Sequence, residues 1–156
     1  MPQIKTLEGF RNYRRLVAEE PGEGTPCIVI CAGTGGQASG SNDIIRIVKR
    51  RILERNLHGK VSLRITGCLG YCEKDPFVLV EPGNHLYPRL KMDDIPRIVD
   101  AAAEGRVVEN LLYKEPGLLK KCPSQEDIPF FKGQTRTILG YNQHLDPIRI
   151  QDYIRA

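Results

Sequence analysis

The stretch Cys31-Ala-Gly-Thr-Gly-Gly-Gln-Ala-Ser-Gly-Ser41 continues the apolar run Cys27-Ile-Val-Ile-Cys31 and precedes a long helical pattern. A short apolar run rich in β-branched residues predicts a strand that is buried on both of its faces. The glycines after Cys31 predict a turn, and Ser41 is a residue type that commonly caps the first turn of a helix. The stretch therefore predicts a buried strand, a glycine-rich turn and a helix, with Cys31 at the end of the strand.

The residues that follow alternate between helical and strand patterns. The helix after Ser41 is expected to end at His58-Gly59, and its apolar stripe is Ile44, Ile45, Val48, Ile52 and Leu53. Strands are expected over residues 61–66, 77–80 and 86–90, with a turn over 81–85, and a further helix over 95–102. This order predicts an α/β domain in which helices cover a central sheet.

Three segments can be distinguished along the chain. Residues 1–25 predict an N-terminal extension with an amphipathic helix over 5–19, followed by a break over 21–26. Residues 26–106 hold the sheet and its helices. Residues 107–156 predict an extended connector arm and a terminal helix that begins near Asp146-Pro147.

Composition excludes several classes of protein. The net charge of +4 and the absence of Trp do not indicate a nucleic-acid partner. No apolar run is long enough to insert into a membrane, and the charged N-terminus lacks the apolar core of a signal peptide. Five cysteines, an odd number, suit reduced thiols or metal ligands better than a disulfide framework. We therefore expect a cytoplasmic protein.

A second cysteine motif, Gly67-Cys-Leu-Gly-Tyr-Cys-Glu-Lys-Asp-Pro76, follows the strand expected over 61–66. Turns at the ends of neighbouring strands can bring Cys31, Cys68 and Cys72 to one small object, and a [2Fe-2S] cluster, which usually has four thiolate ligands, is the best candidate. Gly36 stands where a fourth cysteine would be expected, and on that view Gly36→Cys would complete the ligand shell.

The remaining cysteines are expected elsewhere. Cys27 is separated from Cys31 by about 13 Å at the rise of a strand, so it is expected in the core. Cys122, in Lys-Lys-Cys-Pro-Ser, is expected to be a free thiol at the surface.

Other interpretations of the cysteines remain open at this stage. They could be buried small apolar residues, as cysteine often is. A zinc site is the alternative metal site, although structural zinc prefers cysteines spaced by two residues. Thioredoxin-type disulfide chemistry also needs that closer spacing. The glycine-rich turn lacks the residue pattern of a phosphate-binding loop.

The two motifs together resemble the N-terminal thioredoxin-like [2Fe-2S] ferredoxin domain of the flavoprotein subunit of complex I and of its relatives in NAD-linked hydrogenases and formate dehydrogenases. The family pattern is Cys-x-Gly-Thr-Gly-Cys-x-Ala-x-Gly, then Gly-Cys-x-Gly-x-Cys-x-x-Gly-Pro. Residues 31–40 and 67–76 follow it, with Gly36 at a cysteine position. The stretches Asp94–Val99, Gly105–Tyr113 and Ile128–Phe131 resemble the family's connector into a flavin domain.

This resemblance implies a thioredoxin-like ferredoxin fold and an electron-transfer module of an NADH-dependent oxidoreductase, with Cys31, Cys68 and Cys72 as metal ligands. FMN and NAD would then bind to a partner or to a flavin domain that these 156 residues do not include. The partners would be other subunits of such a complex, docked around Ile128–Phe131 and Tyr153-Ile154, and the chain alone would not be catalytic. The alternative function is a cluster-free adaptor that keeps the fold and docks those subunits.

Overall fold

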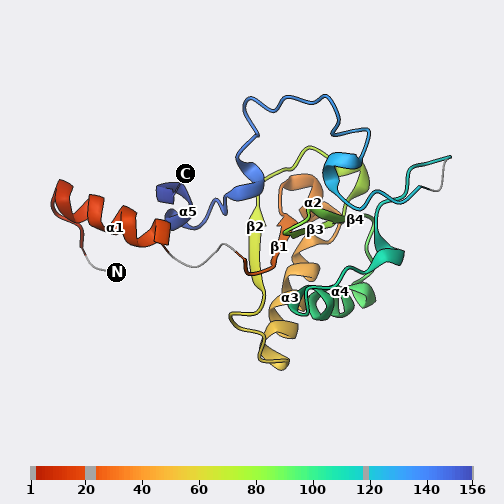
Figure 1. Cartoon of the computed structure of the whole chain (residues 1–156), viewed down its shortest axis with the longest axis horizontal. Helices are drawn as coiled ribbons and strands as arrows, with labels where there is room; N and C mark the ends of the chain where they lie inside the picture. The colour runs from red at the N-terminus through yellow and green to blue at the C-terminus, as the bar shows by residue number, and fades with distance from the viewer. Residues whose placement is uncertain (1–2, 20–23, 118–119, 156) are drawn as a thin grey trace.

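The computed structural model describes residues 3–19, 24–117 and 120–155, and it contains a four-stranded sheet in the order β2-β1-β3-β4 (Figure 1). The strands are β1 (Cys27–Cys31), β2 (Ser62–Thr66), β3 (Val78–Glu81) and β4 (His85–Tyr87). β1 runs parallel to β2 and antiparallel to β3, and β3 pairs antiparallel with β4. The central position of β1 agrees with its continuous apolar sequence, because all five of its residues are buried.

Helices α3 (Ser41–Glu54) and α4 (Ile95–Ala103) lie together on one face of the sheet, and the short α2 (Thr34–Ala38) lies between β1 and α3 (Figure 1). The apolar stripe of α3 packs against the residues of β1 that point to this face, Ile28 and Ile30. The predicted α/β layers are therefore confirmed.

The opposite face of the sheet is covered by the connector arm itself. Cys27, Val29 and Cys31 point to this face and share a buried cluster with Cys122 and Ile128. Cys27 is a core residue, as expected. The expectation for Cys122 is wrong, because Cys122 is 4% exposed rather than a surface thiol. Ile128 is covered by its own chain, and docking of a partner around residues 128–131 stays a prediction.

Main-chain hydrogen bonds attach the arm to the edge of the sheet. The N–H of Tyr113 donates to the Leu86 carbonyl at 3.0 Å, and the N–H of Gln125 donates to the Asn84 carbonyl at 2.8 Å. Single 3-10 turns interrupt the irregular segments, at η1 (Cys72–Lys74), η2 (Met92–Asp94), η3 (Glu109–Leu111), η4 (Gln125–Asp127) and η5 (Asn142–His144).

The two terminal helices, α1 (Leu7–Glu19) and α5 (Ile150–Arg155), lie beside each other at one side of the sheet domain (Figure 1). Arg155 donates two hydrogen bonds to the carbonyl of Val17. The N-terminal helix is thus confirmed, whereas residues 20–23 of the predicted break lie outside the described residues. No helix in the described part of the chain has the length and apolar character needed to cross a bilayer.

Several element ends differ from their predicted positions. The terminal helix begins at Ile150 rather than near Asp146-Pro147, and most strand ends shift by one residue. α3 ends at Glu54 rather than near His58, because Asn56 takes a left-handed backbone with φ of 50°. Leu53 lies within α3 but is exposed, so it does not belong to the core stripe. β4 ends before Pro88, and the left-handed Arg89, with φ of 49°, turns the chain away from the sheet.

Candidate metal centre

The parallel pairing of β1 with β2 brings the cysteine-bearing turns together. Cys31 is paired with Thr66 at the ends of the two strands, and the N–H of Ala32 donates to the Thr66 carbonyl at 2.9 Å. Cys68 follows two residues after Thr66, so both turns leave the same edge of the sheet. The predicted convergence of the motifs is therefore observed in the fold.

Cys68 and Cys72 form the closest pair of thiols. Their Sγ atoms are 3.5 Å apart, and the N–H of Gly70 donates to Cys68 Sγ at 3.3 Å. Two sulfurs bound to one tetrahedral metal at about 2.3 Å would lie about 3.8 Å apart. The pair is therefore already close to the separation that a single iron requires.

Glycines let the first turn approach this pair. A Cβ atom at Gly33 would lie 3.0 Å from Cys68 Cβ, and one at Gly35 would lie 3.1 Å from Cys72 Sγ. Both contacts are tighter than ordinary side-chain packing. The turn before and within α2 thus rests against both cysteines because it carries no side chains at these two positions.

The three thiols differ in their environment. Burial raises the pKa of Cys31, and the nearby N–H groups of Leu69 and Gly33 oppose part of that rise. Cys72 is exposed, and its hydrogen bond with Cys68, followed by partial burial, raises its pKa to about 11. Cys31 and Cys72 are therefore protonated at neutral pH without a ligand, and metal binding has to displace those protons.

Position 36 does not offer room for a fourth thiolate. A Cβ atom on Gly36 would lie 2.4 Å from the carbonyl oxygen of Cys31 and 2.9 Å from Ser41 Oγ. This position faces the backbone at the end of β1 rather than Cys68 and Cys72. A cysteine at position 36 would therefore require the end of β1 or α2 to move, and the expected effect of Gly36→Cys on cluster binding stays a prediction.

Ser41 also behaves differently from its prediction. Gly40, with φ of 97°, occupies the N-cap of α3, and the Ser41 side chain makes no capping hydrogen bond. Its hydroxyl is fully buried and has no hydrogen-bond partner. It fills the space against Gly36.

Asp75 is a residue of this site that sequence reasoning missed. Both of its carboxylate oxygens are buried without a hydrogen-bond partner of ordinary geometry. Burial raises the pKa of Asp75, and the Cys72 thiol beside it opposes part of the rise. The available signal was the motif itself, because Asp75 stands where the pattern of the resembling family has glycine.

The segment after residue 133 crosses over the second motif. Asn142 Nδ2 donates to the carbonyl oxygen of Cys68 at 2.9 Å. Arg136 lies over the ring of Phe131, 4.9 Å from its centroid. Burial lowers the pKa of Arg136, and the nearby Cys68 opposes part of that shift. A positive charge therefore lies near one of the candidate ligands.

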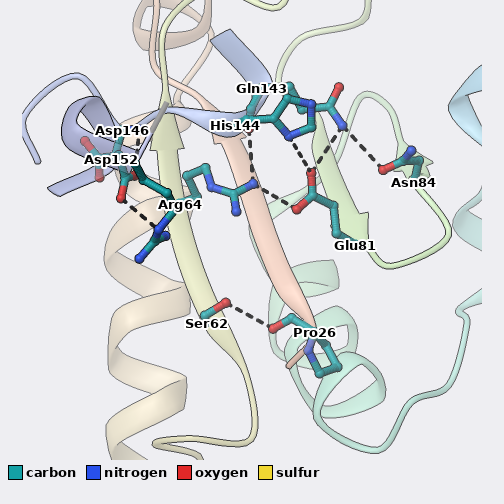
Figure 2. A network of polar contacts seen from close by, with 10 residues as sticks. Pro26, Ser62, Arg64, Glu81, Asn84, Gln143, His144, Asp146 and Asp152 are labelled. Carbon is teal, nitrogen blue, oxygen red and sulfur yellow. Dashed lines mark hydrogen bonds and ion pairs between the residues drawn. The ribbon is translucent and has the colours of Figure 1, made fainter. Parts of the chain in front are cut away.

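A polar network fixes this segment to the sheet (Figure 2). Glu81 on β3 accepts hydrogen bonds from Arg64 of β2 at 2.8 Å and from Gln143 of η5 at 3.2 Å. Arg64 also donates to the main-chain carbonyl of Gln143 at 3.2 Å, and His144 lies 3.9 Å from Glu81 (Figure 2). Because Glu81, a half-buried carboxylate of β3, binds side chains of both β2 and η5, the network holds Asn142 in place over Cys68.

The donor set suits a cluster better than a single ion. Across residues 3–19, 24–117 and 120–155, no group of three or more His, Cys, Asp or Glu side chains could hold one metal ion. A two-iron cluster instead takes two protein ligands on each iron. The Cys68–Cys72 pair fits one iron, and Cys31 lies on the neighbouring strand end for the other.

A mixed sheet of this order, with cysteines on the turns after its parallel strands, defines a thioredoxin-like fold that carries a thiolate site. The sequence model of the thioredoxin-like [2Fe-2S] ferredoxins matches residues 8–103, and the chain belongs to that family. The predicted fold and the predicted ferredoxin family are thus confirmed.

Individual relatives agree with this assignment. A protein described as a 2Fe-2S ferredoxin from Clostridium pasteurianum is 33% identical over 72 residues, which are 46% of this chain and 71% of the relative. The crystal structure of the wild-type thioredoxin-like [2Fe-2S] ferredoxin from Aquifex aeolicus superposes with a TM-score of 0.52 at 22% identity, over 58% of this chain and 98% of that one. A second structure of an Aquifex aeolicus ferredoxin of this kind gives a TM-score of 0.51 at 23% identity, over 60% and 97%. At such identities the similarity to these structures shows the fold alone.

Proposed function

We propose that this chain transfers electrons through a [2Fe-2S] cluster ligated by Cys31, Cys68 and Cys72, as a module of an NADH-dependent oxidoreductase. The observation that carries the proposal is the 3.5 Å separation of Cys68 and Cys72 Sγ on a strand end adjacent to Cys31. When bound, such a cluster accepts and releases one electron at a potential set by its ligands, hydrogen bonds and solvent exposure.

The residues around the thiols have distinct tasks. The glycines at 33 and 35 let the backbone close over the site, and the Gly70 N–H donates to Cys68 Sγ, which favours added negative charge on the sulfur. Arg136 near Cys68 acts in the same direction. Cys72 is the exposed ligand and gives the shortest route for an electron to or from a partner.

The oxidoreductase context rests on the resemblance of the connector stretches. On this proposal FMN and NAD bind to a partner subunit or flavin domain, and the protein works in the cytoplasm. Because Ile128 is buried in its own chain, such a partner would contact the exposed side chains of this region instead, including Phe130 and Tyr153.

A cluster-free adaptor is the second candidate function. The close packing of Gly36 against Cys31 favours the adaptor function, because this turn is tightly packed without a cysteine at position 36. In that case the folded domain would serve only to join subunits.

Anaerobic reconstitution with iron and sulfide separates the two functions. The electron-transfer proposal predicts a red-brown protein with two irons per chain and reversible bleaching by dithionite. Cys68→Ser and Cys72→Ser should each lower the retained iron by about tenfold or more, since even outer-shell partners of metal ligands are worth 10–100-fold in affinity.

Cys27→Ala is the matched control, because Cys27 is a buried cysteine on the same strand as Cys31. It should keep the iron content and the visible spectrum and lose only packing stability. Equal loss of absorbance in Cys27→Ala and Cys68→Ser, or a colourless wild-type chain, would contradict the electron-transfer proposal.

A further inference from the structure

The Asp75 carboxylate is an unusual feature of the turn after Cys72. Neither of its oxygens has a hydrogen-bond partner of ordinary geometry, although both are shielded from solvent and the Cys72 thiol lies beside them. The adjacent Lys74 does not neutralise it, because Lys74 Nζ pairs with Glu73 at 2.6 Å. An unpaired buried carboxylate is costly unless it is protonated or bound to a metal.

The surroundings of Asp75 are those of the candidate cluster. A Cβ atom on Gly35 would lie 3.1 Å from Cys72 Sγ and 3.7 Å from Asp75 Oδ2, so the thiol and the carboxylate border the same small space. The η1 turn holds them there, because the N–H of Asp75 donates to the Cys72 carbonyl at 3.1 Å. Cys31 lies at the end of the neighbouring β1, from which the turn with Gly33 and Gly35 leads to this space.

We propose that Asp75 supplies the fourth protein ligand of the cluster through a carboxylate oxygen, in place of a thiolate at position 36. The inference rests on the proposed [2Fe-2S] function. A carboxylate carries the same single negative charge as a thiolate, and protein carboxylates ligate iron in other sites. The two departures of this chain from the pattern of the resembling family therefore compensate: Gly36 removes a cysteine, and Asp75 replaces a glycine with a ligand.

Ser41 is the competing oxygen donor. Its hydroxyl is also buried and unpartnered, but it faces Gly36 and the end of β1, not Cys72. It would also have to lose a proton whose ordinary pKa is far above that of a carboxyl group. Asp75 is the better ligand on both position and acidity.

Asp75→Asn and Asp75→Cys test the inference, with Glu73→Gln as the control. Glu73 is also a carboxylate within three residues of Cys72, but its side chain is 71% exposed. The four proteins, wild type included, are reconstituted anaerobically, and iron, sulfide, the visible spectrum and the electron paramagnetic resonance of the reduced form are measured. Circular dichroism of the apo proteins shows that each variant folds.

Asp75→Asn should retain about tenfold less iron than wild type, because the amide is a poor replacement for an anionic ligand. Asp75→Cys should bind iron as well as wild type does, with stronger thiolate-to-iron absorption and an altered resonance signal from a four-thiolate shell. Glu73→Gln should match wild type in every measurement.

The measurements distinguish failure of the electron-transfer function from failure of the Asp75 ligand. A wild-type chain that binds no cluster would overturn the proposed function and this inference with it. A folded Asp75→Asn with wild-type iron content and an unchanged spectrum and resonance would overturn the Asp75 ligand alone. An Asp75→Cys protein whose spectrum equals that of wild type would do the same.

Discussion

At the scale of single residues, Gly36 in the middle of α2 packs against the end of β1. Its Cα approaches the Cys31 carbonyl so closely that any Cβ would meet backbone, which cannot move as a flexible side chain can. Glycine is therefore required here by the close approach of two backbone segments and not by a left-handed φ.

Gly36→Ala should lower the stability of the apo protein by about 1–3 kcal/mol, the usual cost of overpacking. The better helix propensity of alanine, worth about 1 kcal/mol, offsets part of this cost. Urea unfolding followed by circular dichroism measures the difference. Ser39→Ala, at the exposed C-cap of the same helix, is the control and should stay within about 0.5 kcal/mol of wild type.

The approach of the cysteine-bearing turns could be predicted from the sequence because it depends on the local order of strands and turns. A strand that ends at Cys31 and a neighbouring parallel strand that ends at Thr66 carry their turns to the same edge. Asp75 could not be found in the same way. Its significance depends on the burial of its oxygens and on their lack of a hydrogen-bond partner of ordinary geometry. Both features come from the packing of η1 against Gly35, which the sequence does not show.

At the scale of elements, α3 and α4 are held together by one ion pair besides their apolar faces. Arg51 of α3 donates to both oxygens of Asp100 of α4, at 3.0 Å for Nε, and both side chains are about three-quarters covered. This hydrogen bond is the main cause of the lowered pKa of Asp100. A bidentate pair between two helices is stronger than an isolated surface pair.

Asp100→Asn should destabilise the protein by about 0.5–1 kcal/mol at pH 7. The folded-state pKa of Asp100 lies below 3.8, the ordinary value for an aspartate. The contribution of Asp100 to the free energy of unfolding is therefore present above pH 3.8 and is lost as the pH falls through the folded-state pKa. The difference between variant and wild type should therefore disappear in acid. Urea unfolding at a series of pH values checks this.

Glu54→Gln removes the exposed, 3.6 Å pair with Arg50 on the same helix and should change stability little at any pH. A pH-independent loss in Asp100→Asn would mean that the pair acts through packing alone.

Helices and strands were predictable because apolar periodicity reports directly which face is buried. The ends of helices and strands were less predictable. The expected end of α3 relied on His58-Gly59, whereas a left-handed Asn56 stops the helix earlier, and asparagine is only an occasional αL residue.

At the scale of the whole molecule, the connector arm forms the second layer of the fold. It covers the face of the sheet that α3 and α4 leave open and buries Tyr113, Cys122 and Ile128 there. The sequence could not indicate this, because the arm is attached by main-chain hydrogen bonds to β4 and its flanking turn, which place few demands on residue type. The division of the chain at residues 106 and 107 stays a prediction.

At the same scale, we expect that NADH does not reduce this molecule directly. Hydride transfer from NADH requires a flavin whose reactive atom is positioned against the nicotinamide. The glycine-rich turns of this chain are occupied by contacts with Cys31, Cys68 and Cys72 and do not match the residue pattern of a nucleotide-binding loop. The reconstituted protein should therefore be bleached rapidly by dithionite. NADH with added FMN should reduce the protein no faster than NADH and FMN reduce a free dye under the same conditions.

Dithionite bleaching is the control for a competent cluster. Reduction of the chain by NADH and FMN well above that background would show that these 156 residues contain a flavin site and that a separate flavin-bearing partner is not required.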